Sequence, residues 1–211
     1  LEQALQFQPN ELFIYPLYVR QGTAITERES DAVCFQMYCA ACDFLKERGF
    51  LQTSMRRFIQ HSSTDAEVSC GYEVMLSCGS GGSIYLGDLH YATRYTVCQR
   101  CIGEEIDKYM STTDFTVVWN GFILSQKEQQ QRFIIKNLMY YMGIDKAEYE
   151  RRFGEPLEMI PLFQQLAEHQ WIKETDNGRI CLTPEGMGYS DYIGQLFVTS
   201  EIRQLMETYS Y

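Results

Sequence analysis

The sequence lacks the features that mark several specialised protein classes. It has only 5 prolines in 211 residues, and its composition excludes collagen, coiled-coil and low-complexity proteins. It contains no window of about 18 apolar residues, so we expect no membrane-spanning helix. Residues 1–9 have no basic start, apolar run or small-residue cleavage site, and we expect no signal peptide. No Asn-x-Ser/Thr glycosylation sequon occurs either.

Positive charge is also scarce. Lys and Arg number 18 against 28 Asp and Glu, which gives a net charge of −10 at pH 7. Affinity for nucleic acids depends on neutralising phosphates, and anionic membranes likewise attract basic segments. We therefore expect neither a nucleic acid nor a membrane as partner. The absence of an export signal, taken together with the cysteines discussed below, predicts a cytoplasmic protein.

What is present is enough apolar material for a folded core. Hydrophobic residues make up 45% of the chain and charged residues 22%, which excludes disorder as the main state. The length suits one domain or two small ones. The chain does not begin with Met, and we expect it to be a piece of a longer protein.

The 8 cysteines favour reduced thiols over a disulfide framework, given the length and the absence of an export signal. Cys98 and Cys101 form a CxxC, a spacing that zinc and redox sites use, and it shares a predicted helix over residues 94–110. Cys34, Cys39 and Cys42 resemble an iron–sulfur triplet at first sight. At about 100° per helical residue, positions 34 and 39 point about 140° apart, so one cluster could not easily collect all three. Core or surface thiols are the favoured interpretation, with a metal site as the alternative.

The first half of the chain reads as alternating strands and helices. Residues 11–19 form a nearly continuous apolar run, typical of a parallel strand buried on both faces. A helix follows over residues 29–48, ended by Gly49, and residues 50–59 read as a further strand. This order predicts an α/β fold. Residues 115–119 and 122–124, on either side of Asn120-Gly121, predict a hairpin.

A glycine-rich turn, Cys78-Gly-Ser-Gly-Gly-Ser-Ile-Tyr85, follows an apolar segment. Its spacing matches neither a dinucleotide fingerprint nor a P-loop nor a nucleophile elbow. Glycines allow the backbone to approach a ligand closely, so a plain turn and a ligand-facing turn both remain open. The small uncharged residues favour an uncharged ring over a phosphate.

The second half predicts a string of helices with one hairpin. Ser125 and Glu128 form a capping box that opens a helix through Met142, and further helices are expected from Asp145 and over residues 157–169. Residues 171–175 and 179–182 read as a hairpin, and Thr183-Pro184 begins the last helices, which reach about residue 208. This outline is that of a winged helix. Residues 125–211 carry 9 Lys and Arg against 13 Asp and Glu, which argues against DNA binding and for a packing or lid module.

Several segments together resemble the distal half of oxygen-independent coproporphyrinogen III oxidase and its radical S-adenosylmethionine relatives. They are Ile14-Tyr-Pro-Leu-Tyr18, the glycine-rich turn, Phe133-Ile-Ile-Lys-Asn-Leu-Met-Tyr-Tyr-Met-Gly143, Pro161-Leu-Phe-Gln-Gln-Leu166, Arg179-Ile-Cys-Leu-Thr-Pro-Glu-Gly186 and the segment from Tyr189 to Phe197. The resemblance implies an α/β (α+β) fold. Residues 1–124 would be the distal part of an incomplete radical (β/α) barrel, and residues 125–211 a winged-helix-like, mostly helical domain.

The resemblance also implies a chemistry. Such enzymes use a [4Fe–4S] cluster to cleave S-adenosylmethionine to a 5′-deoxyadenosyl radical, and the oxidase decarboxylates porphyrinogen propionates. Gly79, Gly81, Gly82 and Ile84 would then bind the adenosyl group. The family's Cys-x3-Cys-x2-Cys motif is absent from these residues. We therefore expect no cluster, metal site or catalytic residue in this chain and no activity of the fragment alone, with cluster and S-adenosylmethionine belonging to the parent protein.

The resemblance predicts the substrate less well than the chemistry. Gln52-Thr-Ser-Met-Arg-Arg-Phe58 departs from the acidic, His-containing stretch of the true oxidases, so a relative with another substrate, tetrapyrrole or not, is expected. Arg56 or Arg57 could pair a substrate carboxylate, although arginines on an edge strand are more often simply solvated. The alternatives are a non-catalytic haem-chaperone-like or protein-interaction module and a zinc protein. A truncated barrel would also expose a strand edge over residues 12–19, which favours a homodimer.

Overall fold

The computed structural model describes residues 1–17, 19, 25, 27–60, 74–94, 96, 98–117 and 120–208. Tyr18, Val118 and Trp119, which belong to segments predicted above, lie outside these residues. Contacts divide the chain into two units: Leu1–Leu17, Glu29–Ala66 and Gln130–Val198 form the first, and Tyr18–Arg28, Glu67–Gln129 and Thr199–Tyr211 the second. The boundary expected between residues 124 and 125 stays a prediction.

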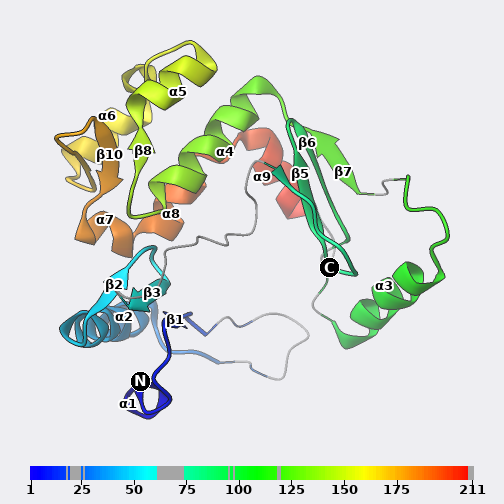
Figure 1. Ribbon diagram of the computed structural model, residues 1–211, viewed down its shortest axis with the longest axis horizontal. Helices are drawn as coiled ribbons and strands as arrows, with labels where there is room; N and C mark the ends of the chain where they lie inside the picture. The colour runs from blue at the N-terminus through cyan, green and yellow to red at the C-terminus, as the bar shows by residue number, and fades with distance from the viewer. Residues whose placement is uncertain are drawn as a thin grey trace. The chain divides into compact units, whose positions relative to one another are not determined.

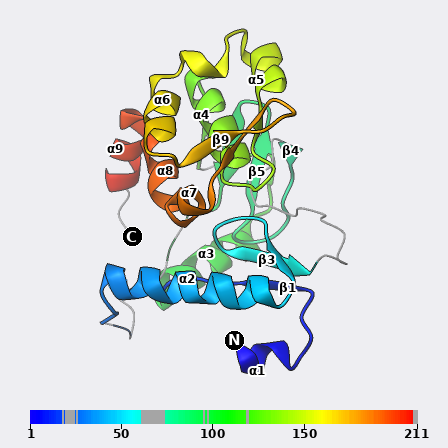
Figure 2. The same cartoon turned by 90° about the vertical axis from the view of Figure 1, so that its left-hand side faces the viewer.

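The first unit begins with a helix laid on a small sheet. Its elements are α1 (Glu2–Leu5), β1 (Glu11–Phe13), α2 (Asp31–Glu47), β2 (Phe50–Gln52) and β3 (Arg57–Gln60). The strands form an antiparallel sheet in the order β1-β3-β2, and α2 runs along it (Figure 2). Cys42, Leu45, Phe50 and Phe58 make the core between helix and sheet. Gly49 follows the end of α2, as predicted, and the Ser30 hydroxyl caps the helix start, which lies two residues after the predicted one.

The parallel, doubly buried strand predicted over residues 11–19 is wrong. β1 has only three residues, pairs with β3 antiparallel and is an edge strand of its sheet. Phe13 is 51% exposed, whereas Leu12 and Ile14 pack on the core, because alternate side chains of this edge strand point to opposite faces of the sheet. Residues 50–59 likewise form two strands joined by a turn, β2 and β3, where one strand was expected.

The remainder of the first unit is a helical layer with a second sheet. Its elements are α4 (Gln126–Leu138, shared with the second unit), β8 (Ile144–Asp145), α5 (Lys146–Phe153), η1 (Leu157–Met159), α6 (Pro161–Glu168), β9 (Ile172–Glu174), β10 (Arg179–Leu182), α7 (Pro184–Gly188) and α8 (Ser190–Leu196). The three strands are antiparallel in the order β8-β10-β9. Buried apolar side chains from every helix of this layer form one continuous core.

Three of the predicted helix starts in this layer are confirmed, whereas the helix predicted from residue 157 begins at Pro161, after the short 3-10 helix η1. The Ser125 N–H donates to Glu128 Oε2 (2.6 Å) and the Glu128 N–H to Ser125 Oγ (3.3 Å), a reciprocal capping box. Asp145 and Thr183 cap α5 and α7. α4 ends at Leu138, four residues before the predicted end. The reason is tertiary, since the Tyr141 N–H donates to the Thr53 carbonyl (2.8 Å), which draws the backbone away from helical bonding.

The second unit is built on a four-stranded antiparallel sheet (Figure 1). It contains β4 (Val74–Met75), β5 (Ser83–Leu86), β6 (Leu89–Ala92), α3 (Gln99–Ser111), β7 (Gly121–Ile123) and α9 (Ser200–Thr208), with strand order β4-β5-β6-β7. Val118 and Trp119 of the predicted hairpin lie outside the described residues; within them, β7 pairs with β6, and Gly121 lies opposite Tyr91. Residues 115–117 form no strand: Asp114 accepts the Thr116 N–H (2.9 Å), which turns the chain there.

Three sheets account for the named strands among the described residues, and none of them closes into a barrel. The fold is thus mixed helix and sheet, as predicted, with antiparallel pairing throughout its named strands. Within the same residues, no helix combines the length and apolarity needed to cross a membrane.

Candidate functional site

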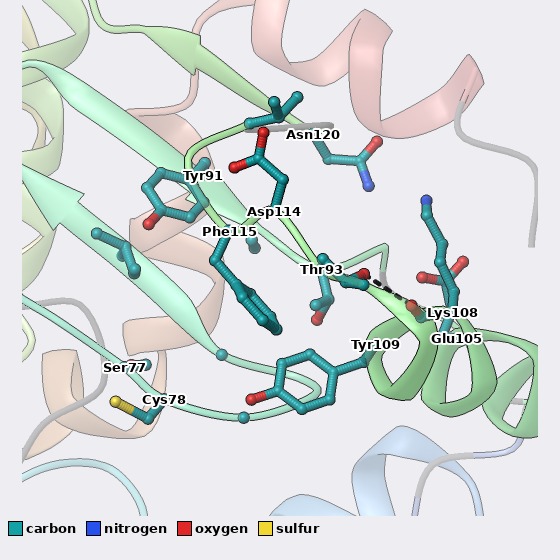
Figure 3. Close-up of a pocket in the computed structure, with 16 residues that line it drawn as sticks. Ser77, Cys78, Tyr91, Thr93, Glu105, Lys108, Tyr109, Asp114, Phe115 and Asn120 are labelled. Carbon is teal, nitrogen blue, oxygen red and sulfur yellow. Dashed lines mark hydrogen bonds between the residues drawn. The ribbon is translucent and has the colours of Figure 1, made fainter.

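A pocket of about 430 Å³ lies in the second unit, between the glycine-rich turn, one face of the sheet and α3 (Figure 3). Strand alternation decides which side chains reach it. Ile84 on β5 pairs with Tyr91 on β6, and both line the pocket. Tyr85, His90 and Phe122 occupy the alternate positions of β5, β6 and β7 and form an aromatic row of their own, with ring centroids 4.1 and 5.3 Å apart.

Three of the four residues predicted to approach an adenosyl group line this pocket, namely Gly79, Gly82 and Ile84, and Gly81 does not. The glycines have a local explanation. Gly79 and Gly81 have φ angles of +101° and +87°, which side chains rarely adopt. A Cβ on Gly82 would lie 3.1 Å from Ser77 Cβ. The turn is therefore shaped by its own backbone requirements and also forms a wall of the pocket.

α3 supplies the opposite wall. Glu105, Lys108, Tyr109 and Thr112 line the pocket at the i, i+3, i+4, i+7 spacing of one helix face. Thr112 Oγ1 donates to the Lys108 carbonyl (2.7 Å), the hydrogen bond drawn in Figure 3. Sequence reasoning missed this face, although the helical spacing of these side chains was its available signal.

Two aromatic rings and one carboxylate complete the pocket. The rings of Phe115 and Tyr109 meet edge to face with centroids 5.6 Å apart (Figure 3). Asp114 lies beside Phe115 on the rim. The Thr116 hydroxyl (2.6 Å) and backbone N–H (2.9 Å) both donate to Asp114 Oδ1, which lowers the pKa of that carboxyl below its ordinary value. The pocket thus offers apolar ring surface, the carboxylates of Asp114 and Glu105 and the Lys108 ammonium, a set suited to a small molecule with a planar ring and charges of both signs.

The two predicted substrate-binding arginines lie in the first unit. Arg56 lines a second pocket, of about 400 Å³, together with Tyr15, Met139 and Asp191. Its Nη2 donates to Asp191 Oδ2, and its guanidinium lies 5.6 Å from the Tyr15 ring centroid. Arg57 does not line that pocket, because its Nε donates to Glu11 Oε1 across β3 and β1.

The expectation that these arginines are solvated on an edge strand is wrong. Arg57 begins β3, the central strand of its sheet, and Arg56 directly precedes it; their side chains are only 12% and 27% exposed. Each is held by a carboxylate from a distant part of the sequence, a pairing that periodicity could not indicate.

The three cysteines of α2 differ in their exposure to solvent. Cys34, Cys39 and Cys42 lie on different faces of α2, partly exposed, exposed and buried respectively, as the helical spacing predicted. Burial raises the pKa of Cys42, and Cys34 Sγ donates to the Glu29 carbonyl (3.6 Å). These thiols do not fit an iron–sulfur cluster. Across the described ranges, no three His, Cys, Asp or Glu side chains are gathered as a metal would need.

Cys98 and Cys101 are joined in a disulfide, so the expectation of reduced thiols is wrong for this pair. Their Cα atoms lie 5.3 Å apart at the first turn of α3. Such a separation is within the range that a disulfide spans without backbone movement.

Comparison with known proteins gives one solved structure that shares this fold. No protein-family model matches the sequence. No curated protein matches it either. Coproporphyrinogen III oxidase (HemN) from Escherichia coli, a radical SAM enzyme, has a similar structure, with a TM-score of 0.68 at 16% sequence identity. The match covers 94% of this chain and 50% of that one, so this chain spans about half the length of that enzyme. The resemblance predicted from the sequence is thereby confirmed at the level of the fold: this chain has the fold of about half of that coproporphyrinogen III oxidase.

Proposed function

We propose that this chain is the C-terminal portion of an oxygen-independent coproporphyrinogen III oxidase-like radical S-adenosylmethionine enzyme. The observation that carries the proposal is the fold shared with that oxidase over 94% of this chain. In this proposal residues 1–124 are the distal part of the radical barrel and residues 125–211 a winged-helix-like domain. The order of α4, β8, α5 and α6, followed by the β9–β10 hairpin on a three-stranded sheet, supports the winged-helix assignment.

The pocket beside the glycine-rich turn would hold the adenosyl group of S-adenosylmethionine. Its volume of about 430 Å³ lies in the range of small-molecule sites. Phe115 and Tyr109 would contact the adenine ring, while Asp114 and Lys108 would face the charged methionyl end. When bound in the parent enzyme, S-adenosylmethionine supplies a radical for hydrogen abstraction. The residues of this chain bind and orient the molecule and exclude water from it.

The cluster of the parent enzyme has no place among these residues. The Cys-x3-Cys-x2-Cys spacing is absent from the sequence, and the three cysteines of α2 occupy different faces. In our proposal the cluster is held by other residues of the parent protein. The chain by itself is therefore expected to bind ligand without turning it over.

Calorimetric titration with S-adenosylmethionine and with adenosine tests the adenosyl site. We expect one saturable site for both molecules in the wild-type chain. The variant Phe115→Ala should weaken binding about tenfold, because an aromatic ring stacked on a base contributes about 1–3 kcal/mol.

Phe122→Ala is the matched control. It removes an equal ring from the opposite face of the same sheet, where Phe122 contacts His90. Its affinity should equal that of the wild type. If neither ligand saturates the wild-type chain, or if both variants lose affinity equally, the adenosyl assignment does not hold.

Arg56 or Arg57 would bind a substrate carboxylate in the parent enzyme, and the contacts favour Arg56. Arg56 lines a pocket, and its carboxylate partner Asp191 is 52% exposed and could be displaced by a ligand. Arginine suits this role because it pairs carboxylates in a bidentate manner. A porphyrin with propionate side chains would be a suitable substrate for this site, because each propionate carries a carboxylate.

Fluorescence titration with coproporphyrin distinguishes the two arginines. Asp191→Asn should tighten coproporphyrin binding several-fold, because it removes the competing carboxylate. Arg56→Gln should weaken binding about tenfold, as expected for the loss of one charge-assisted contact. Arg57→Gln should change it little if Arg56 is the ligand-binding residue. Loss of binding only in Arg57→Gln would reverse the assignment.

A non-catalytic module is the second candidate, favoured by the exposed apolar side chains on and after β1. Phe13, Tyr15 and Leu17 are 51%, 63% and 50% exposed. β1 is also an edge strand of its sheet and could pair with another chain. We propose a homodimer through this edge. Sedimentation should show a dimer whose dissociation constant rises when Phe13 is replaced by Lys, and a monomer at all concentrations would exclude it.

A further inference from the structure

The Cys98–Cys101 disulfide lies at a position that favours thiol chemistry. Cys98 is the N-cap of α3, a helix of 13 residues, and Cys101 lies in its first turn. The backbone N–H of Cys101 donates to Cys98 Sγ at 3.1 Å. Both residues are partly exposed and therefore within reach of a molecule in solution.

This position stabilises a thiolate on Cys98 once the disulfide is opened. The N-terminus of a helix carries a partial positive charge, and the N–H of Cys101 already points at the sulfur. A CxxC at a helix N-terminus is an environment in which cysteine becomes nucleophilic near neutral pH. The buried cysteines differ, because burial raises the pKa of Cys42 and of Cys181.

Two other roles fit the disulfide less well. A structural staple stabilises most when it closes a long loop, whereas this one spans a sequence separation of 3. A zinc site needs further ligands, and the structure gathers no group of three or more candidate ligands anywhere in its described residues.

We propose that Cys98–Cys101 is a redox-active disulfide that exchanges with dithiols and small-molecule disulfides. In the oxidising direction, the Cys98 thiolate attacks one sulfur of a disulfide, whose S–S bond breaks and whose first thiolate leaves. Cys101 then loses its proton and attacks Cys98 Sγ, which forms the internal disulfide and releases the second thiolate. The cysteine pair loses two electrons and two protons, and the external disulfide becomes two thiols. A dithiol drives the reverse reaction.

The pair also sits on the helix that forms one wall of the pocket. Glu105, Lys108 and Tyr109 follow it along α3. The redox reaction itself does not depend on what that pocket binds, so its test is independent of the proposed function.

Peptide mapping measures the exchange directly in the full chain. The protein is equilibrated over graded ratios of reduced to oxidised dithiothreitol, alkylated and digested with trypsin without reduction. Cleavage after Arg94, Arg100 and Lys108 separates the two cysteines, so oxidised protein yields residues 95–100 joined to residues 101–108. We expect the joined peptide to fall from most of the signal to none as the ratio rises. A joined peptide that survives every ratio, or none in the absence of reductant, would overturn the proposal.

The reactivity of Cys98 provides the second readout. In the variant Cys101→Ser, iodoacetamide should alkylate Cys98 at pH 6.5 about tenfold faster than Cys78, in keeping with a thiolate favoured at a helix N-terminus. Cys78 is the internal reference, since it is exposed but lies on the glycine-rich turn. Cys78→Ser should leave the joined-peptide titration unchanged. Equal rates for the two thiols in a folded variant would show that α3 does not activate Cys98, against the proposal.

Discussion

Replacing Gly143 with alanine is expected to lower the free energy of unfolding by about 2–5 kcal/mol, the sum of a strained backbone and an overpacked core. Gly143 has a φ angle of +68°, which side chains rarely adopt. An added Cβ would lie 2.2 Å from the Ile180 carbonyl oxygen and 2.5 Å from Cys181 Sγ. Neither neighbour is a flexible side-chain end that can move aside cheaply.

The surroundings of Gly143 make the clash hard to relieve. Arg179 donates to the carbonyls of Met142 (2.7 Å) and Gly143 (2.9 Å) and holds the segment against β10. β8 begins at the next residue and pairs with β10. A shift of Gly143 away from Ile180 would therefore loosen the three-stranded sheet as well.

Gly154→Ala is the control for backbone strain alone. Gly154 ends α5 with a φ angle of +78°, but a Cβ there would meet nothing within 4 Å. Gly154→Ala should lower the free energy of unfolding by only about 1–2 kcal/mol. Urea unfolding followed by circular dichroism measures both variants. Equal costs for the two would show that contact with Ile180 and Cys181 adds nothing at Gly143.

Replacing Tyr149 with phenylalanine is expected to stabilise the protein by about 1–2 kcal/mol at neutral pH, because burying an unbonded hydroxyl is costly. Tyr149 is 0% exposed, and its hydroxyl has no hydrogen-bond partner in the part of the chain that the structure describes. Its ring packs on Phe133 and Phe153, with centroids 5.9 and 4.9 Å away. Phenylalanine keeps this packing and removes the unsatisfied oxygen.

The same variant should change stability at alkaline pH. Burial, with the charge of Glu155 as a smaller cause, raises the pKa of Tyr149 to about 12. An unfolded tyrosine titrates near pH 10, so between pH 10 and 12 the unfolded chain loses a proton that the folded chain keeps. Stability therefore falls as the pH rises through this window, by roughly 2–3 kcal/mol at its upper end.

Tyr149→Phe should lack this alkaline loss, so its advantage over the wild type should grow above pH 10. Unfolding by urea at pH 8 and at pH 11 measures the difference. Tyr192→Phe is the control, because Tyr192 is 57% exposed and should behave as the wild type at both pH values. A Tyr149→Phe variant less stable than the wild type at pH 8 would mean that the hydroxyl has a partner in solution.

The elements that the sequence predicted well are those fixed by neighbouring residues. The Ser125–Glu128 capping box, the Asp145 cap and the turn at Gly178 each depend on contacts within three or four residues. The glycine-rich turn was likewise placed correctly, since positive φ angles at Gly79 and Gly81 are a local requirement. Such signals depend only on residues that are close in the sequence, so they do not change with the packing of the rest of the chain.

The errors in strand assignment share one physical cause: the pairing partner of a strand lies far away in the sequence. Residues 11–19 read as a buried parallel strand because apolar runs do not reveal how many faces are covered. The partner of β7 was likewise not indicated by the sequence, because β6 lies about 30 residues earlier in the chain. A capping box forms from neighbouring residues alone, whereas a strand can pair with any other strand of the chain.

The candidate site likewise combines features that the sequence predicted with features that only the tertiary structure revealed. The sequence by itself determined the turn with Gly79, Gly82 and Ile84, the helix that carries Tyr109, and the resemblance that the shared fold confirms. Only the tertiary structure decided that Phe115 and Asp114 join them around one pocket, and that Cys98 and Cys101 bond at the start of α3. It also decided that Arg56 faces Asp191, 135 residues further along. Local hydrogen bonds and backbone angles are encoded within a few residues, whereas cavities and ion pairs exist only after segments distant in sequence have packed together.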